Sequence, residues 1–123
     1  MGLSPDDRRK AVALGEEAER VVARRYERDG WTVLAHRWMG GGAEVDLIVR
    51  DVDRLRFVEV KLRKPEDPVG FEAVDARKVA RLRRAGDAFL VDYQGAVREA
   101  CIAVALVACV DGRWSIDLLD DAV

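Results

Sequence analysis

The chain has 123 residues and a formal net charge of −2, with 50% hydrophobic and 36% charged residues. This length predicts one domain over residues 1–123, and the composition is typical of a soluble globular protein and excludes a disordered chain. The sequence has no apolar run of the roughly 20 residues that a membrane helix needs, and its polar N-terminal segment lacks a signal-peptide pattern. We therefore expect a cytoplasmic protein with no membrane partner.

The first predicted element is a helix over residues 7–29, closed by Gly30. At about 100° per residue, Glu19 lies roughly a quarter turn from the apolar stripe of this helix, so its carboxylate can face a site along the sheet edge. The stripe comprises Ala11, Leu14, Ala18, Val21, Val22 and Tyr26.

A strand over residues 31–36 is predicted next, and Gly40-Gly41-Gly42 then connects it to a hairpin. We interpret these glycines as a turn, because a phosphate-binding loop would be followed by Lys-Ser/Thr and a helix. The lone histidine, His36, falls in this strand and is expected to be structural.

The hairpin over residues 44–61 carries the most informative pattern. Its apolar and charged residues alternate with the period of 2 that is typical of half-buried strands, around a turn at residues 51–54. If the turn closes symmetrically, Asp46 lies opposite Glu59 and Glu44 opposite Lys61, all on one face. Opposed carboxylates destabilise a strand pair unless a cation neutralises them.

The hairpin therefore predicts a site for a hard divalent cation, which takes oxygen ligands. Lys61, beside Glu59 on the same face, can orient or help deprotonate an attacking water. The alternative that the pattern leaves open is an exposed hairpin face on which Glu and Lys side chains pair across the strands.

The remaining elements are a surface loop over residues 64–70, a helix over about 72–91 and two strands over 101–109 and 114–118, joined by an Asp111-Gly112 turn. The order αβββαββ predicts an α/β fold, a mixed sheet with helices on both faces, and the apolar fourth strand belongs in its buried centre. Cys101 and Cys109 lie too far apart on that strand for a disulfide, so we expect reduced core thiols.

Basic side chains gather in both helices and at the end of the hairpin. They can follow a phosphate backbone if the fold brings them to one side, whereas the alternative is solvated helix faces with Glu–Arg pairs. The three groups are Arg20, Arg24, Arg25 and Arg28; Lys61, Arg63 and Lys64; and Arg77, Lys78, Arg81, Arg83 and Arg84.

These motifs resemble the YraN-like family of uncharacterised bacterial proteins and, more widely, the PD-(D/E)XK nuclease superfamily, which includes archaeal Holliday junction resolvases. The matching segments are Gly15-Glu-Glu-Ala18-Glu19, Ala43-Glu44-Val45-Asp46-Leu47-Ile48, Phe57-Val58-Glu59-Val60-Lys61 and Ala73-Val74-Asp-Ala-Arg-Lys78. The chain departs from the pattern at Ala18 and Ala43, which replace family glycines, and at Ala100, where an aspartate would follow Arg98.

The resemblance implies a restriction-endonuclease-like core and a single PD-(D/E)XK nuclease-like domain over residues 1–123. It implies that Asp46, Glu59 and the backbone carbonyl of Val60 bind the metal. Lys61 would be the catalytic lysine, with Glu44 and Glu19 completing the acidic site. Contacts to nucleic acid would come from Lys78, Arg63, Lys64 and Arg81.

The function that we expect is a Mg²⁺- or Mn²⁺-dependent endonuclease that hydrolyses phosphodiester bonds in DNA, with branched or junction DNA suggested by the resolvases. The alternative is a non-catalytic nucleic-acid-binding or adaptor protein that retains the nuclease fold. Junction-cleaving relatives work as pairs, so a homodimer stays open, as does the choice between DNA and RNA.

Overall fold

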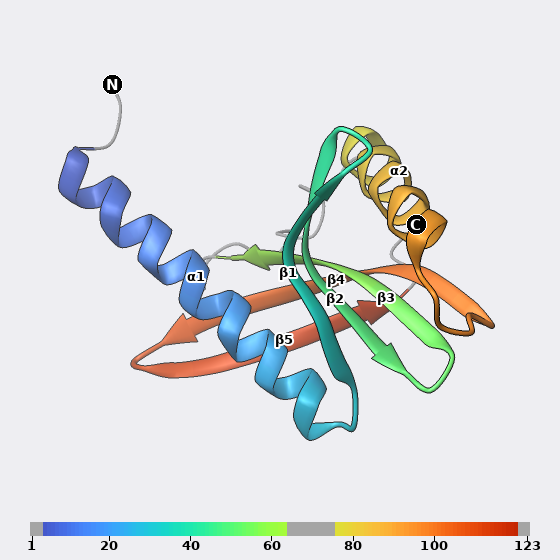
Figure 1. Ribbon diagram of the computed structural model, residues 1–123. Coiled ribbons are helices and arrows are strands. Elements are labelled where there is room, and N and C mark those ends of the chain that lie inside the picture. The colour runs from blue at the N-terminus through green and yellow to red at the C-terminus, as the bar shows by residue number, and fades with distance from the viewer. Residues whose placement is uncertain (1–3, 64–75, 121–123) are drawn as a thin grey trace.

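The computed structural model describes residues 4–63 and 76–120. The order of its elements is the predicted one, helix, three strands, helix and two strands (Figure 1). The elements are α1 (Pro5–Arg28), β1 (Thr32–Gly40), β2 (Ala43–Asp51), β3 (Arg54–Leu62), α2 (Ala76–Asp92), β4 (Glu99–Val110) and β5 (Arg113–Asp120).

The strands form one mixed sheet in the order β1-β2-β3-β4-β5. Strands β3 and β4 pair in parallel, and the other neighbours pair antiparallel. The apolar strand β4 is buried at residues 102–108, as expected, but it lies between β3 and the edge strand β5, so the central strand is β3 and not β4. A parallel pair needs a crossover connection, and α2 lies in the segment that joins β3 to β4.

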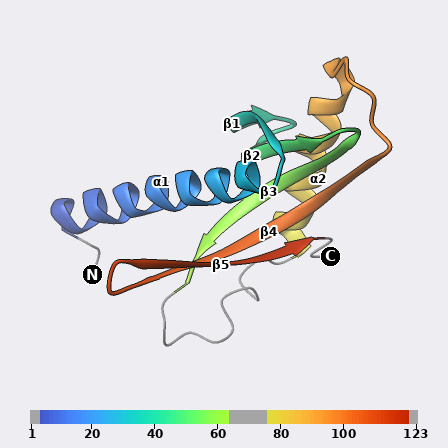
Figure 2. The same ribbon diagram turned by 90° about the horizontal axis from the view of Figure 1, so that it is seen from below.

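The two helices cover opposite faces of the sheet, as Figures 1 and 2 show, and this confirms the predicted layers. Helix α1 packs Ala18, Val22 and Tyr26 into a cluster with side chains of β2, β3 and β4. Helix α2 packs Val79 and Leu82 into a second cluster that includes other side chains of β2, β3 and β4. Burial of one apolar stripe of each helix is what holds these layers together.

Helix α1 begins at Pro5, with the Ser4 hydroxyl accepting a hydrogen bond from the backbone N–H of Asp7 at 3.1 Å. Its first turns extend past the sheet (Figure 2). The expected apolar stripe is therefore wrong at its start, because Ala11 is exposed and Leu14 is 42% exposed. Only the second half of α1 has a sheet to pack against.

Strand β1 continues to Gly40, four residues beyond the predicted end at His36. Its pairing with β2 shifts register between Val33 and Ala35, an irregularity that the sequence pattern did not reveal. Gly41 and Gly42 have φ angles of 61° and 80°, which glycine adopts without strain, and they form the turn into β2. The interpretation of these glycines as a turn is confirmed.

The β1–β2 turn lies against α2. A Cβ atom added to Gly41 would lie 2.6 Å from the backbone oxygen of Arg84. A Cβ added to Gly86 would likewise lie 3.0 Å from the ring of Phe57 on β3. These two glycines thus let α2 lie close to both the β1–β2 turn and strand β3.

The predicted register of the β2–β3 hairpin is confirmed next to its turn, but the predicted pairs of Asp46 with Glu59 and of Glu44 with Lys61 are not part of the ladder. Its pairs run from Asp51 with Arg54 at the turn to Leu47 with Val58. The ladder stops there, one step before Asp46 and Glu59. The separation of the two strands at this end opens the sheet beside the acidic residues.

The predicted loop over residues 64–70 and the start of the second helix lie outside the described residues. Cys101 and Cys109 are thiols that are only half-buried, so the expectation that they lie in the core is wrong. The Asp111-Gly112 turn is confirmed between β4 and β5. Within the described ranges, no helix is long and apolar enough to cross a membrane.

Candidate active site

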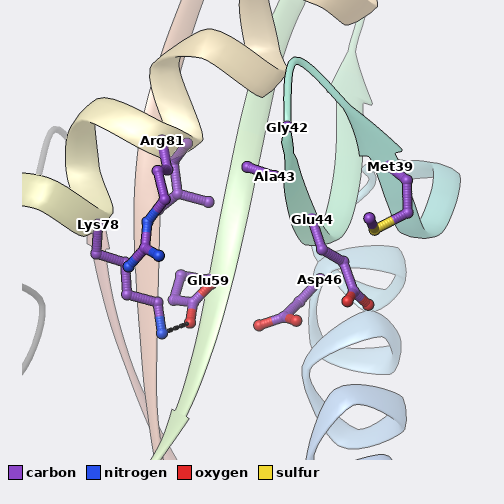
Figure 3. Close-up of a pocket in the computed structure, with 9 residues that line it drawn as sticks. Met39, Gly42, Ala43, Glu44, Asp46, Glu59, Lys78 and Arg81 are labelled. Carbon is purple, nitrogen blue, oxygen red and sulfur yellow. Dashed lines mark ion pairs between the residues drawn. The ribbon is translucent and has the colours of Figure 1, made fainter.

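A cleft of about 430 Å³ lies where β2 and β3 separate, and α2 forms its opposite wall (Figure 3). Carboxylates come from the strands, and cationic side chains come from the helix. The lining residues are Met39, Gly42, Ala43, Glu44, Asp46, Glu59, Lys78, Arg81 and Leu82. The cleft therefore places acidic and basic groups on facing walls.

Asp46 is tied to the neighbouring strand. Its Oδ2 accepts a hydrogen bond from the backbone N–H of Val60 at 2.7 Å. The side chain thereby provides an acceptor for a strand N–H just beyond the point where the β2–β3 ladder ends. This contact fixes the carboxylate of Asp46 beside β3, in the cleft that Glu59 also lines.

The pKa of Asp46 is raised to about 7. Burial is the main cause, because it disfavours the charged form, and the negative charge of Glu59 is the second. The hydrogen bond from Val60 opposes this rise, while Glu19 and Glu44 add to it. The acidic residues singled out in the sequence thus act on one another electrostatically, and a cation at Asp46 would favour its ionised form.

Glu59 is only 7% exposed, and its Oε1 lies 2.5 Å from Nζ of Lys78 on α2 (Figure 3). A buried carboxylate requires a partner of opposite charge or several hydrogen bonds. Sequence reasoning assigned Lys78 to phosphates and missed this ion pair. No local pattern marks it, because the contact depends on how α2 packs on the sheet.

Glu19 and Lys61 are not among the residues that line the cleft. Glu19 binds the guanidinium of Arg37 through hydrogen bonds of 3.1 to 3.3 Å, and Arg37 has a φ of 49° in β1. The charge of Glu19 still contributes to the raised pKa of Asp46. Lys61 is half-buried and lies on β3 two residues beyond Glu59, hence on the same face.

The predicted nucleic-acid contacts are only partly brought together. Arg81 and Lys78 line the cleft, whereas Arg63 lies at the end of β3 and pairs with Asp117 of β5 at 3.6 Å. Lys64 lies outside the described residues.

Several lining residues had not been singled out from the sequence. Met39 and Gly42 reach the cleft because β1 extends to the glycine turn, and Leu82 does so from the buried side of α2. The Gly40-Gly41-Gly42 segment was the available signal, since a tight turn there returns the chain to Glu44. The approach of this turn to α2 was not evident.

The donor set suits a hard cation. Asp46 and Glu59 offer carboxylate oxygens in one cleft, and the repulsion between them, seen in the raised pKa of Asp46, is what a cation would relieve. In the part of the chain that the structure describes, no three His, Cys, Asp or Glu side chains are grouped to hold a metal ion by themselves. A cation here would complete its shell with backbone oxygen and water, as Mg²⁺ does.

Comparison with known proteins identifies the chain's relatives. The model of the uncharacterised protein family UPF0102 matches residues 18–111. A UPF0102 protein of Ruegeria pomeroyi is 37% identical over 88% of this chain and 85% of its own length. A UPF0102 protein of Gloeobacter violaceus is 44% identical over 82% of this chain and 81% of its own length.

The fold and the cleft define an α/β protein with an acidic hairpin end facing a basic helix. The chain belongs to the UPF0102 family, the YraN family that its motifs resemble. The matched range includes β2, β3 and α2, which provide the carboxylates and cationic groups of the cleft.

Proposed function

We propose that this protein is a metal-dependent endonuclease that hydrolyses phosphodiester bonds in DNA. The observation that carries the proposal is the convergence of Asp46 and Glu59 in one cleft, opposite Lys78 and Arg81 of α2. Paired carboxylates that repel one another offer nothing to a phosphate on their own. With a divalent cation between them and cationic side chains across the cleft, the same arrangement suits a phosphodiester.

The metal would be Mg²⁺ or Mn²⁺, held by Asp46, Glu59 and the backbone carbonyl of Val60. When bound, such an ion polarises a phosphoryl oxygen and lowers the pKa of a coordinated water. The hydrogen bond from the Val60 N–H holds Asp46 ready on the strand side of the cleft.

Lys61 and the cationic wall of the cleft have separate roles in this proposal. Lys61 shares the face of Glu59 on β3 and positions the water that attacks the phosphate. Arg81, which is exposed on α2, binds phosphate oxygens, since its planar guanidinium suits them. The resemblance of the hairpin motifs to the PD-(D/E)XK nucleases supports these assignments and points to branched or junction DNA.

A second candidate function is a non-catalytic nucleic-acid-binding or adaptor role. It is favoured by the ion pair of Lys78 with Glu59, which neutralises that carboxylate without any metal. If this pair were permanent, the cleft would need no divalent cation and would bind phosphates through the arginines of α2 alone. Such binding would weaken with added salt and would not respond to Mn²⁺ specifically.

Calorimetric titration of Mn²⁺ tests the proposal. The wild type is compared with the double variant Asp46→Ala, Glu59→Ala and with a control of equal charge change, Glu17→Ala, Glu27→Ala, on the exposed side of α1. We expect the wild type and the control to bind Mn²⁺ and the double variant of the cleft to lose binding. Incubation with flapped, branched and single-stranded DNA should then show cleavage that EDTA and Lys61→Ala abolish.

The result that contradicts the proposal is equally clear. A wild type that binds no Mn²⁺, even with duplex DNA present, leaves only the non-catalytic candidate. Retained cleavage in the double variant would show that the reaction takes place elsewhere.

A further inference from the structure

An ion pair joins the two walls of the cleft. Nζ of Lys78 on α2 lies 2.5 Å from Oε1 of Glu59 on β3. The side chain of Glu59 is 9% exposed and that of Lys78 is 35% exposed, and both line the cleft, so solvent reaches the lysine more readily than the carboxylate. The same carboxylate is one of those proposed to hold a divalent cation.

A divalent cation and the ammonium group of Lys78 compete for Glu59. Both are attracted to the same oxygen atoms, and like charges at contact distance repel strongly where solvent is partly excluded. Movement of Lys78 away from Glu59 would remove this repulsion and free Oε1 for a metal ion. A lysine is suited to such movement, because its charge is carried on a flexible stem of four carbons.

The cleft provides a destination for the displaced group. Arg81 lies one helical turn after Lys78 on α2 and lines the same cleft. In the described ranges, no carboxylate forms an ion pair with Arg81. A phosphate bound there would offer oxygen atoms to the ammonium group that leaves Glu59.

We infer that Lys78 is a displaceable internal cation: it neutralises Glu59 in the metal-free protein, yields that carboxylate to a divalent cation and then binds a phosphate of the nucleic acid. The inference rests on the proposed function and adds its regulation. It makes metal and nucleic acid bind cooperatively, because each favours the position of Lys78 that the other requires. The coupling is reciprocal, so nucleic acid tightens metal binding by the same factor.

The first test is calorimetric titration of Mn²⁺ in the absence of nucleic acid. Loss of the competing charge in Lys78→Gln should tighten Mn²⁺ binding about tenfold relative to the wild type. Lys78→Arg keeps a cation beside Glu59, so its Mn²⁺ affinity should stay within about threefold of that of the wild type. The same is expected of Arg84→Gln, which removes a charge from α2 outside the cleft. Thermal melts followed by circular dichroism check that each variant is folded.

The second test uses a labelled DNA duplex with nuclease-resistant phosphorothioate linkages, followed by fluorescence anisotropy. Mn²⁺ should tighten binding of this duplex to the wild type and to Arg84→Gln. In Lys78→Gln, the increase in duplex affinity caused by Mn²⁺ should be smaller by about the same tenfold factor, since no ammonium group is released.

The outcomes separate the inference from the proposed function. If Lys78→Gln binds Mn²⁺ no more tightly than the wild type, Lys78 does not compete for Glu59 and the inference is overturned while the metal site stands. If Lys78→Gln binds Mn²⁺ and the wild type does not, the competition is demonstrated in its strongest form. If none of the proteins binds Mn²⁺, even with the duplex present, the proposed function fails, and the inference fails with it.

Discussion

Asp46 of β2 and Val60 of β3 are joined by a hydrogen bond of 2.7 Å from the backbone N–H of Val60 to Oδ2 of Asp46. The bond lies just past the last pair of the β2–β3 ladder, Leu47 with Val58. It holds a carboxylate at the position where the strands separate, next to Glu59. The local cost is electrostatic, because burial and Glu59 raise the pKa of Asp46 to about 7.

This cost predicts the pH dependence of stability. Since the pKa of Asp46 is about 7 in the folded protein and about 4 when unfolded, the folded state binds the proton more tightly, and this carboxyl makes stability fall as pH rises from about 4 to 7. Asp46→Asn keeps an acceptor for Val60 and does not titrate. In EDTA, the free energy of unfolding of Asp46→Asn relative to that of the wild type should rise between pH 5 and pH 8. The rise should be on the order of 1–2 kcal/mol, after discounting for solvent screening.

Urea unfolding at the two pH values measures this difference, with Asp87→Asn, an exposed aspartate of α2, as the control. If the difference in free energy of unfolding between the wild type and Asp46→Asn does not change with pH, the pKa of Asp46 is not raised by folding. The same variant should lose the nuclease activity that we propose, because an amide is a poor ligand for a hard cation.

Metal binding should depend on pH for the same reason. A ligating carboxylate must be deprotonated. At pH 5 a group whose pKa is about 7 is mostly protonated, so the free energy needed to remove its proton lowers the affinity for Mn²⁺. We expect Mn²⁺ to bind about a hundredfold more weakly at pH 5 than at pH 8, since two pH units below the pKa correspond to that factor. Thermal melts with and without Mn²⁺ should accordingly show a larger stabilisation at pH 8, and equal shifts at both pH values would exclude Asp46 as a ligand.

The hairpin was predictable from the sequence because its determinants are local. Alternation of apolar and charged residues fixes which side chains share a face, and the turn at residues 51–54 fixes the register, so Asp46 and Glu59 could be placed together. The splaying of the strands beyond Leu47 was not predictable. No turn or pattern marks the point at which a ladder ends.

Contacts between distant elements account for the rest. The pair of Lys78 with Glu59 depends on the close approach of α2 to β3, which is set by packing. Arg37, whose guanidinium binds Glu19, has a positive φ although it is not a glycine, and sequence patterns indicate neither feature.

The exposed cation of the cleft gives a prediction for nucleic-acid binding. Arg81→Gln should weaken DNA binding roughly fivefold and reduce the slope of log affinity against log salt concentration by about 1, because one phosphate contact is lost. Arg113→Gln, an equal charge change at the start of β5, should leave the slope unchanged. Anisotropy titrations over a range of salt concentrations test this, and matching slopes for the two variants would remove Arg81 from the interface.

The approach of α2 to the sheet can be tested with two helical glycines. A Cβ at Gly15 of α1 meets nothing within 4 Å, whereas a Cβ at Gly86 of α2 lies 3.0 Å from the ring of Phe57. Gly15→Ala should therefore stabilise the protein by roughly 0.5–1 kcal/mol through helix propensity. Gly86→Ala makes the same propensity gain but must displace the Phe57 ring, so it should be about 1 kcal/mol less stable than Gly15→Ala.

Because displacement of α2 also moves Lys78 relative to Glu59, Gly86→Ala should alter Mn²⁺ affinity, whereas Gly15→Ala should not. Chemical denaturation gives the two stabilities, and calorimetry gives the two affinities. Equal free energies of unfolding would show that displacement of the Phe57 ring does not destabilise the protein. Unequal stabilities with identical Mn²⁺ affinities would show that the cleft does not depend on the close contact between α2 and β3.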